Sequence, residues 1–135
     1  MNVLRVIFRS KYKKILKERR FEKLSGELYP KILKCMRDDA PYLNADFTIS
    51  DLGRLIGTNR TYISYTLNRH GADFNTLVRR FRCNRLINLI QEGPQKYDVE
   101  EMALLSGFPS ARTMCVLLKR HHPDVYLMVK AFVKK

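Results

Sequence analysis

Two segments of this sequence, residues 59–68 and 110–119, carry hydrogen-bonding side chains at helical spacing. The first segment presents Asn59, Arg60, Thr61, Ser64, Tyr65 and Asn68. The second presents Ser110, Arg112, Cys115 and Lys119, with the apolar Val116 among them. Amide, hydroxyl and guanidinium groups on a helix can hydrogen-bond to base edges in the major groove of DNA. These residues therefore favour contact with double-stranded DNA, for which the second segment offers fewer donors than the first.

The two segments belong to an internal repeat. Residues 49–57 (ISDLGRLIG) align with residues 99–107 (VEEMALLSG) at a spacing of fifty. After one extra residue in the second copy, residues 59–70 (NRTYISYTLNRH) align with residues 110–121 (SARTMCVLLKRH). Each copy predicts a short helix, a turn that contains glycine, and a second helix of about twelve residues.

The composition of each copy meets the requirements of a helix-turn-helix unit. Two helices joined by a short turn pack at a steep angle only if a small residue lies where they cross, and Gly53 and Ala103 meet this condition. Gly57 and Gly107 can adopt the positive φ that the turn needs. The expected inward residues are Ile63 and Leu67 in the first copy, and Met114, Leu117 and Leu118 in the second. A single such hairpin could belong to an ordinary helical core, but two copies in register favour two helix-turn-helix units.

The whole sequence predicts an all-α fold, with about seven helices in the globular part and a basic helix before them. Tyr29-Pro30 indicates a helix start, because proline is tolerated in a first turn. Ser50 and Asp98 are expected to cap the first helix of each unit, and apolar spacing predicts one long linker helix over residues 74–92. The predicted organisation is a basic extension or linker over 1–27 and a DNA-binding domain over 28–135, with helix-turn-helix units over 47–71 and 98–122 and a terminal helix over 123–135.

Charge separates the N-terminal quarter from the rest of the chain. The 135 residues carry a net charge of +13, and residues 1–37 hold twelve basic and three acidic side chains, or +9 of this total. Such an excess favours a polyanionic partner, either nucleic acid or an anionic membrane surface. The basic side chains interleave with Tyr12, Ile15, Leu16 and Phe21. The stretch fits an amphipathic helix against a membrane or partner, a DNA-contacting arm, or a linker to a further domain, which we favour.

Other chemistries find little support in the sequence. Cys35, Cys83 and Cys115 form no Cys-x-x-Cys pair, so neither a disulfide framework nor a metal site is expected, and a reducing cytoplasm fits best. The histidines have no nucleophile and carboxylate beside them that would suit catalysis. We therefore expect no enzymatic activity and no cofactor. No apolar stretch approaches the roughly 18 residues that a transmembrane helix needs, although the N-terminus could adjoin a membrane segment of a larger regulator.

Residues 47–90 (FTISDLGRLIGTNRTYISYTLNRHGADFNTLVRRFRCNRLINLI) and 99–114 (VEEMALLSGFPSARTM) resemble the DNA-binding domain of AraC/XylS-type transcription regulators. The Gly-Phe-x-Ser motif at residues 107–110 is a hallmark of such domains, and so is Arg82 before an apolar-rich helix. The resemblance implies a bacterial, cytoplasmic protein that binds specific DNA sequences and regulates transcription initiation. Its further implied partners are RNA polymerase and a second copy of the chain. The two polar sets named above would lie on two recognition helices, joined by the linker helix.

The second unit departs from the family, whose usual phenylalanines are replaced by Met114 and Leu118. This unit could read bases, contact backbone phosphates or serve only in packing. A helical protein-interaction module and a non-specific nucleic-acid binder are the alternative functions. On the linker helix, Arg82 is expected to pair with an acidic residue of the second unit, because a buried guanidinium needs a partner. Arg79 and Arg80 fit either a phosphate contact or a solvated surface.

Overall fold

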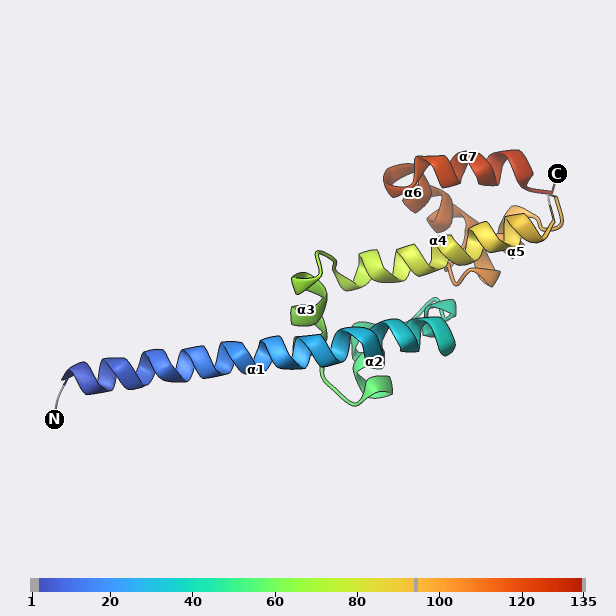
Figure 1. Ribbon diagram of the computed structural model, residues 1–135. Coiled ribbons are helices and arrows are strands. Elements are labelled where there is room, and N and C mark those ends of the chain that lie inside the picture. The colour runs from blue at the N-terminus through green and yellow to red at the C-terminus, as the bar shows by residue number, and fades with distance from the viewer. Residues whose placement is uncertain (1–2, 94, 135) are drawn as a thin grey trace.

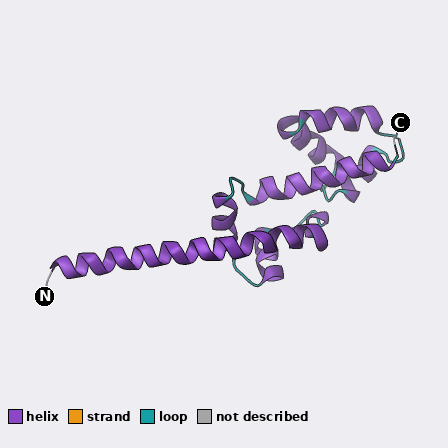
Figure 2. Ribbon diagram, in the orientation of Figure 1, coloured by secondary structure: helices purple, strands orange, loops and turns teal. Residues whose placement is uncertain are grey.

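The computed structural model describes residues 3–93 and 95–134, which are mostly helical (Figure 1 and Figure 2). Seven α-helices and one short 3-10 helix make up this part of the chain and no strand occurs in it, so the predicted all-α class is confirmed. The elements are α1 (Val3–Asp38), η1 (Pro41–Leu43), α2 (Ile49–Ile56), α3 (Arg60–Arg69), α4 (Phe74–Glu92), α5 (Val99–Leu105), α6 (Ala111–His121) and α7 (Pro123–Phe132). None of the described helices is long and apolar enough to cross a membrane.

Helix α1 is longer than the sequence predicts. It runs without a break through Pro30, so the helix start expected at Tyr29-Pro30 is wrong. Proline inside a helix removes one backbone hydrogen bond and crowds the preceding turn. The helix continues here because Leu28 and Ile32, on either side of the proline, are both buried, and Ile32 packs in a hydrophobic core with residues of α2 and α3. Tertiary packing has therefore joined the basic N-terminal stretch and the first helix of the folded part in one rod (Figure 1).

The folded part contains two hydrophobic cores. The first is formed by the second half of α1 together with α2, α3 and the start of α4, and the second by the rest of α4 together with α5, α6 and α7. Fully buried members of the first core are Ile32, Met36, Leu52, Ile63 and Leu67. Those of the second core include Leu86, Met102, Phe108, Met114 and Leu118. Each of the two predicted helix-turn-helix units is therefore packed around a core of its own.

Helix α4 belongs to both cores. Its bounds, Phe74–Glu92, agree with those predicted for the linker helix. Leu77 and Val78 are buried in the first core, whereas Cys83 and Leu86 are buried in the second. The two units are thus held by opposite halves of one continuous helix, which lies between them in Figure 1.

Arg82 joins the two units through backbone carbonyl groups. Its Nε donates to the carbonyl oxygen of Tyr42 at 2.9 Å, and a terminal nitrogen donates to that of Asn44 at 3.1 Å. Its guanidinium carbon lies 5.8 Å from the ring centroid of Phe108 in the second unit. The expected pairing of Arg82 with an acidic residue is therefore wrong. Partial burial lowers the pKa of Arg82, and the two carbonyl dipoles stabilise its charge in place of a carboxylate.

Gly107 marks a close approach between the two units. Its φ of 90° lies in the region that favours glycine. A Cβ atom at this position would overlap with the carbonyl oxygen of Tyr42 and lie 2.8 Å from Cα of Leu43. Both the turn of the second unit and its contact with η1 therefore require a residue without a side chain.

The terminal helix is shorter than the predicted range of 123–135, the last residue of which lies outside the described part of the chain. Helix α7 ends at Phe132. Beyond it, the backbone N–H of Lys134 donates to the carbonyl oxygen of Tyr97 at 2.8 Å. This hydrogen bond to the α4–α5 connection takes the place of a further helical turn.

Candidate nucleic-acid interface

The two helix pairs, α2–α3 and α5–α6, have equivalent turns. The backbone N–H of Thr58 donates to the carbonyl oxygen of Gly53 at 2.8 Å, and that of Phe108 donates to Ala103 at 2.9 Å. The glycine before each donor has a positive φ, 73° in the first pair and 90° in the second. A Cβ on Gly53 would lie only 2.9 Å from the carbonyl oxygen of Thr58, in agreement with the small residue that the crossing requires. The repeat spacing of fifty residues is thus also the spacing of equivalent hydrogen bonds.

Equivalent side chains attach each second helix to its core. Ile63 and Leu67 of α3 are fully buried, and so are Met114 and Leu118 of α6. Leu117, which was also expected to face inward, is half-buried. Because both helices bury residues at i and i+4, the same side of each is turned toward its core and the opposite side faces outward.

The first helices of the two pairs are both capped by side chains, but only one cap was predicted correctly. Thr48, and not Ser50, caps α2: its hydroxyl accepts from the backbone N–H of Asp51 at 3.2 Å, and Asp51 accepts from that of Thr48 at 2.9 Å. The expectation for Ser50 is wrong because the helix already includes this residue. Asp98 caps α5 as predicted and accepts from the backbone N–H of Glu101 at 2.8 Å.

One side of α3 is exposed and polar. The exposed residues expected there are Arg60, Thr61, Ser64 and Asn68. Because successive helical residues are about 100° apart, Thr61, Ser64 and Asn68 fall within a sector of about 60° on the side away from Ile63. Asn59 is the N-cap of this helix, and its Oδ1 accepts from a backbone N–H of the first turn at 3.1 Å. The structure therefore brings three of the predicted contact residues together and commits the side-chain oxygen of Asn59 to the helix start.

Helix α1 covers another side of α3. The ring centroid of Phe21 lies 5.2 Å from that of Tyr62 and 4.9 Å from that of Tyr65. Tyr29 stacks on His70 with a centroid distance of 3.6 Å. Tyr65, which was expected to face outward, is therefore half-buried against α1. The sequence prediction did not include this contact, which places the basic N-terminal helix next to the candidate recognition helix.

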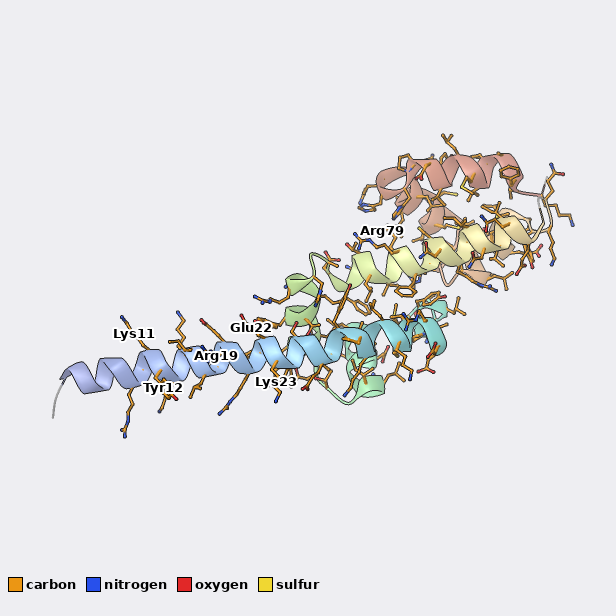
Figure 3. All side chains as sticks on the ribbon, in the orientation of Figure 1. Lys11, Tyr12, Arg19, Glu22, Lys23 and Arg79 are labelled. Carbon is orange, nitrogen blue, oxygen red and sulfur yellow. The ribbon has the colours of Figure 1, made fainter. Side chains whose placement is uncertain are left out.

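The first half of α1 projects away from the folded part (Figure 1). All residues from Arg9 to Arg20 are exposed, and this arm carries seven basic side chains and one acidic side chain. Figure 3 shows Lys11, Tyr12 and Arg19 on the part of α1 that has no other helix beside it. Where the arm meets α3, a cavity of about 430 Å³ is lined by Lys13, Leu16, Lys17, Arg20, Phe21, Leu24 and Tyr62. Three of the arm's cations thus lie at the edge of α3.

An ion pair extends the contact between α1 and α3. The carboxylate of Glu22, which Figure 3 labels on α1, lies 3.5 Å from the guanidinium of Arg69. Both side chains are about half exposed, at 53% and 52%. A pair as exposed as this contributes little to stability, because water and salt screen it. The aromatic packing around Phe21 is therefore the main attachment of this stretch of α1.

The exposed side of α6 is less polar than that of α3. Ser110 is its N-cap, and the hydroxyl accepts from the backbone N–H of Thr113 at 3.1 Å. Arg112 is exposed, and the apolar side chain of Val116 is 50% exposed on the next turn. Among Ser110, Arg112 and Val116, only Arg112 offers a hydrogen-bonding group that is not already used within the helix.

Helix α7 lies beside the other predicted contact residues of α6 and restricts their access to a partner. Cys115 is half-buried and lines a cavity beside α7. The Nζ atom of Lys119 lies 5.0 Å from the ring centroid of Tyr126 in α7. Lys119 is nevertheless exposed, so its ammonium group remains accessible at seven residues, or about two turns, from Arg112.

The cysteines and histidines form no metal site in the part of the chain that the structure describes. Cys35 and Cys83 are buried and Cys115 is half-buried, all as free thiols. Burial raises the pKa of Cys83 to about 11, so this thiol is protonated at neutral pH and is a poor nucleophile.

Comparison with known proteins found no match, either among protein families, among curated proteins or among solved structures. The resemblance to AraC/XylS-type regulators therefore stays a prediction that is based on the sequence motifs.

Proposed function

We propose that this chain is a double-stranded DNA-binding module that recognises specific sequences and regulates transcription initiation. The observation that carries the proposal is the exposed polar side of α3, formed by Thr61, Ser64 and Asn68. Ile63 and Leu67 hold the helix to its core from the other side. A helix supported in this way can enter the major groove, which is about 12 Å wide, with its hydrogen-bonding groups toward the bases.

In this proposal α3 reads the bases. The guanidinium of Arg60 suits a bidentate contact with guanine, and the amide of Asn68 suits one with adenine. The hydroxyl groups of Thr61 and Ser64 can donate to or accept from several bases. We assign Asn59 to positioning, because its side-chain oxygen already caps the helix.

Helix α6 has a different role in the same proposal. Arg112 and Lys119 are exposed about two turns apart and suit contacts with backbone phosphates. Val116 lies between them and can contact a thymine methyl group. We therefore expect the second unit to supply affinity and register, and less base discrimination than the first.

Helix α4 and the arm of α1 complete the proposed mode of binding. The 19 residues of α4 span about 28 Å, which is compatible with two units that contact the duplex about one helical turn, or ~34 Å, apart. The seven basic side chains of the arm attract phosphate regardless of base sequence. Binding should therefore weaken steeply as the salt concentration rises.

The test starts with selection of bound sequences from a random DNA pool. The affinities for a selected duplex and a random duplex are then measured at several salt concentrations. The wild-type chain should prefer the selected duplex by about 10³-fold or more. Asn68→Ala should reduce this preference, whereas Asn88→Ala, which removes another exposed amide, on α4, should not change it. An equal loss of affinity for both duplexes in Asn68→Ala would mean that the reading side has been misassigned.

A protein-interaction module is the second candidate, and exposed leucines of the second unit favour it. Leu104 on α5 and Leu127 on α7 are 61% and 66% exposed. In a transcription regulator such a surface could contact RNA polymerase or a second copy of the chain. Gel-shift assays with promoter fragments separate the two candidates, because a pure interaction module would give no salt-sensitive shift.

A further inference from the structure

A cavity of about 410 Å³ lies where α4 passes from the first core to the second. It is lined by Ala45, Phe47, Phe74, Asn75, Val78, Arg79, Arg82, Phe108, Leu117 and His121. Phe47 and Phe74 pack with the first core, while Phe108 and Leu117 pack with the second. The volume falls in the range of small-molecule sites, which is about 300–1,000 Å³. A molecule in this cavity would contact both helix-turn-helix units.

The polar lining of the cavity is cationic. It includes the guanidinium groups of Arg79 and Arg82, the imidazole of His121 and the amide of Asn75, but no carboxylate. Arg82 is already bonded to two backbone carbonyls. The charge of Arg79 is therefore the one that a bound anion could use.

Arg79, which lines the cavity, has an unsatisfied hydrogen-bonding group. Its Nε is buried and has no hydrogen-bond partner among the described residues. The carboxylate of Asp73 interacts with the charge of Arg79, but its oxygen accepts from the backbone N–H of Thr76 at 2.7 Å as the cap of α4. A buried donor on a charged group is costly to leave unbonded, more so than a neutral one. The position of Arg79 in Figure 3, at the part of α4 that faces α6 and α7, agrees with a role at the junction.

We propose that this cavity binds a small molecule with an aromatic body and a single anionic group. The anionic group accepts hydrogen bonds from Arg79, and the aromatic body lies among Phe47, Phe74 and Phe108. A carboxylate and a phosphate ester share the required chemistry, since both accept from the planar guanidinium in a bidentate manner. The three phenylalanine rings favour a planar apolar body over a flexible polar one.

The site would also regulate the proposed DNA binding. This step rests on the proposed function, whereas binding of the anion does not. The ligand contacts residues of both units, so a change in the arrangement of α3 relative to α6 would alter the cavity. The ligand should therefore bind some arrangements of the two units more tightly than others. A ligand shifts such an equilibrium by its differential affinity for the two states, so the affinity for DNA should change when the cavity is filled.

Titration calorimetry on the full chain tests the proposal with three probes of one shape: 1-naphthoate, 1-naphthyl phosphate and the neutral 1-naphthalenemethanol. At least one anion should bind saturably, and the neutral alcohol should bind about ten-fold more weakly or not at all. The better of the two anions identifies the head group. Equal binding of the alcohol, or no saturable binding of either anion up to millimolar concentration, would overturn the proposal.

Two variants locate the site. Arg79→Met should weaken binding of the anion about ten-fold or more, whereas Arg80→Met, which removes the neighbouring exposed cation of α4, should leave it unchanged. If Arg79→Met fails to fold, Asn75→Trp places a large side chain on the exposed rim of the cavity and should likewise weaken binding of the anion. Unchanged binding in the folded variants would contradict the proposed position.

Measurements of DNA binding distinguish failure of the small-molecule site from failure of the proposed function. If the anion binds and the chain has no affinity for DNA, the cavity stands and the proposed function falls. If neither anion binds, and Arg79→Met weakens DNA binding while Arg80→Met does not, the partner of Arg79 is a DNA phosphate and the small-molecule site is wrong.

Discussion

The two helix pairs share their turn hydrogen bonds and their buried positions, yet they expose different surfaces. On α3, three polar residues lie together on the outward side. On α6, the corresponding region exposes Val116 between two cations, and Cys115 is half-buried. The repeated motif therefore determines how each second helix is held, but not what that helix presents to a partner.

The flanking helices account for part of this difference. Phe21 of α1 packs against Tyr62 and Tyr65 of α3, while α7 lies beside Cys115 and Lys119 of α6. Each flank removes one side of a second helix from solvent. The α1 flank brings a strongly basic arm with it, so the first unit gains a cationic edge that the second unit obtains mainly from its own residues.

The largest difference in stability is expected between alanine substitutions at the two turn glycines. At Gly57 a Cβ would meet no atom within 4 Å, so Gly57→Ala carries only the strain of a φ of 73°, about 1–2 kcal/mol. Gly107→Ala adds an overlap with the backbone of η1 and should lower the free energy of unfolding by about 3 kcal/mol or more. Urea unfolding of both variants measures the difference. Equal losses would show that the units are not in contact at Gly107.

Removal of the guanidinium that joins the units should have the next largest effect. Arg82→Met leaves the carbonyl oxygens of Tyr42 and Asn44 without their donor, and hydrogen bonds to charged groups are worth about 1.5–3 kcal/mol. Arg85→Met, on the same helix one turn later, is the matched control. Thermal and urea unfolding should show a loss for the first variant only, and an unchanged stability of Arg82→Met would remove this residue from the junction.

A smaller difference in stability is expected between variants of Thr48, the observed N-cap of α2, and of Ser50, the N-cap expected from the sequence. Thr48→Ala removes a hydroxyl that accepts from a backbone N–H, and should cost about 1 kcal/mol. Ser50 is the second residue of α2. Ser50→Ala should therefore change the free energy of unfolding by no more than a few tenths of the change expected for Thr48→Ala. Ser110→Ala, at the cap of α6, should resemble Thr48→Ala. A greater loss for Ser50→Ala than for Thr48→Ala would contradict the observed helix start.

The smallest effect concerns pH. Hydrogen bonds from backbone N–H groups lower the pKa of Asp51 in the first unit and of Asp98 in the second. A folded-state pKa below the unfolded value stabilises the fold above the unfolded pKa of about 3.9, and this contribution is lost as the pH falls through the folded pKa. The free energy of unfolding should therefore fall at acid pH. Asp51→Asn and Asp98→Asn should each reduce this fall, and a stability that rises on acidification would contradict both assignments.

The sequence predicted those parts of the structure that local patterns determine. The bounds of α4, the positive φ of Gly57 and Gly107, and the inward side of α3 all follow from periodicity and glycine placement. The positions of Thr61, Ser64 and Asn68 on one side follow from the same periodicity. These features depend on residues within one or two helical turns of each other.

The parts that were missed depend on contacts between distant residues. Pro30 suggested a helix start locally, but burial on both sides of it keeps α1 continuous. Phe21 lies on the side of α1 that covers α3, seven residues before the buried Leu28. This apolar spacing of about two helical turns could have indicated a partner for the basic stretch. Arg82 donates to the backbone carbonyls of Tyr42 in η1 and of Asn44 just after it, about forty positions away. Every residue has such a carbonyl, so the residue types in the sequence do not identify this partner.

Hydroxyl-radical footprinting on a selected DNA measures directly whether both helix pairs contact one stretch of duplex. We expect two protected patches about one helical turn, ~34 Å, apart on the same face of the DNA. Arg112→Ala with Lys119→Ala should remove one patch and leave the patch that belongs to α3. A single patch in the wild-type chain that persists in this double variant would show that α6 does not reach the DNA, and the two-unit mode of binding would be contradicted.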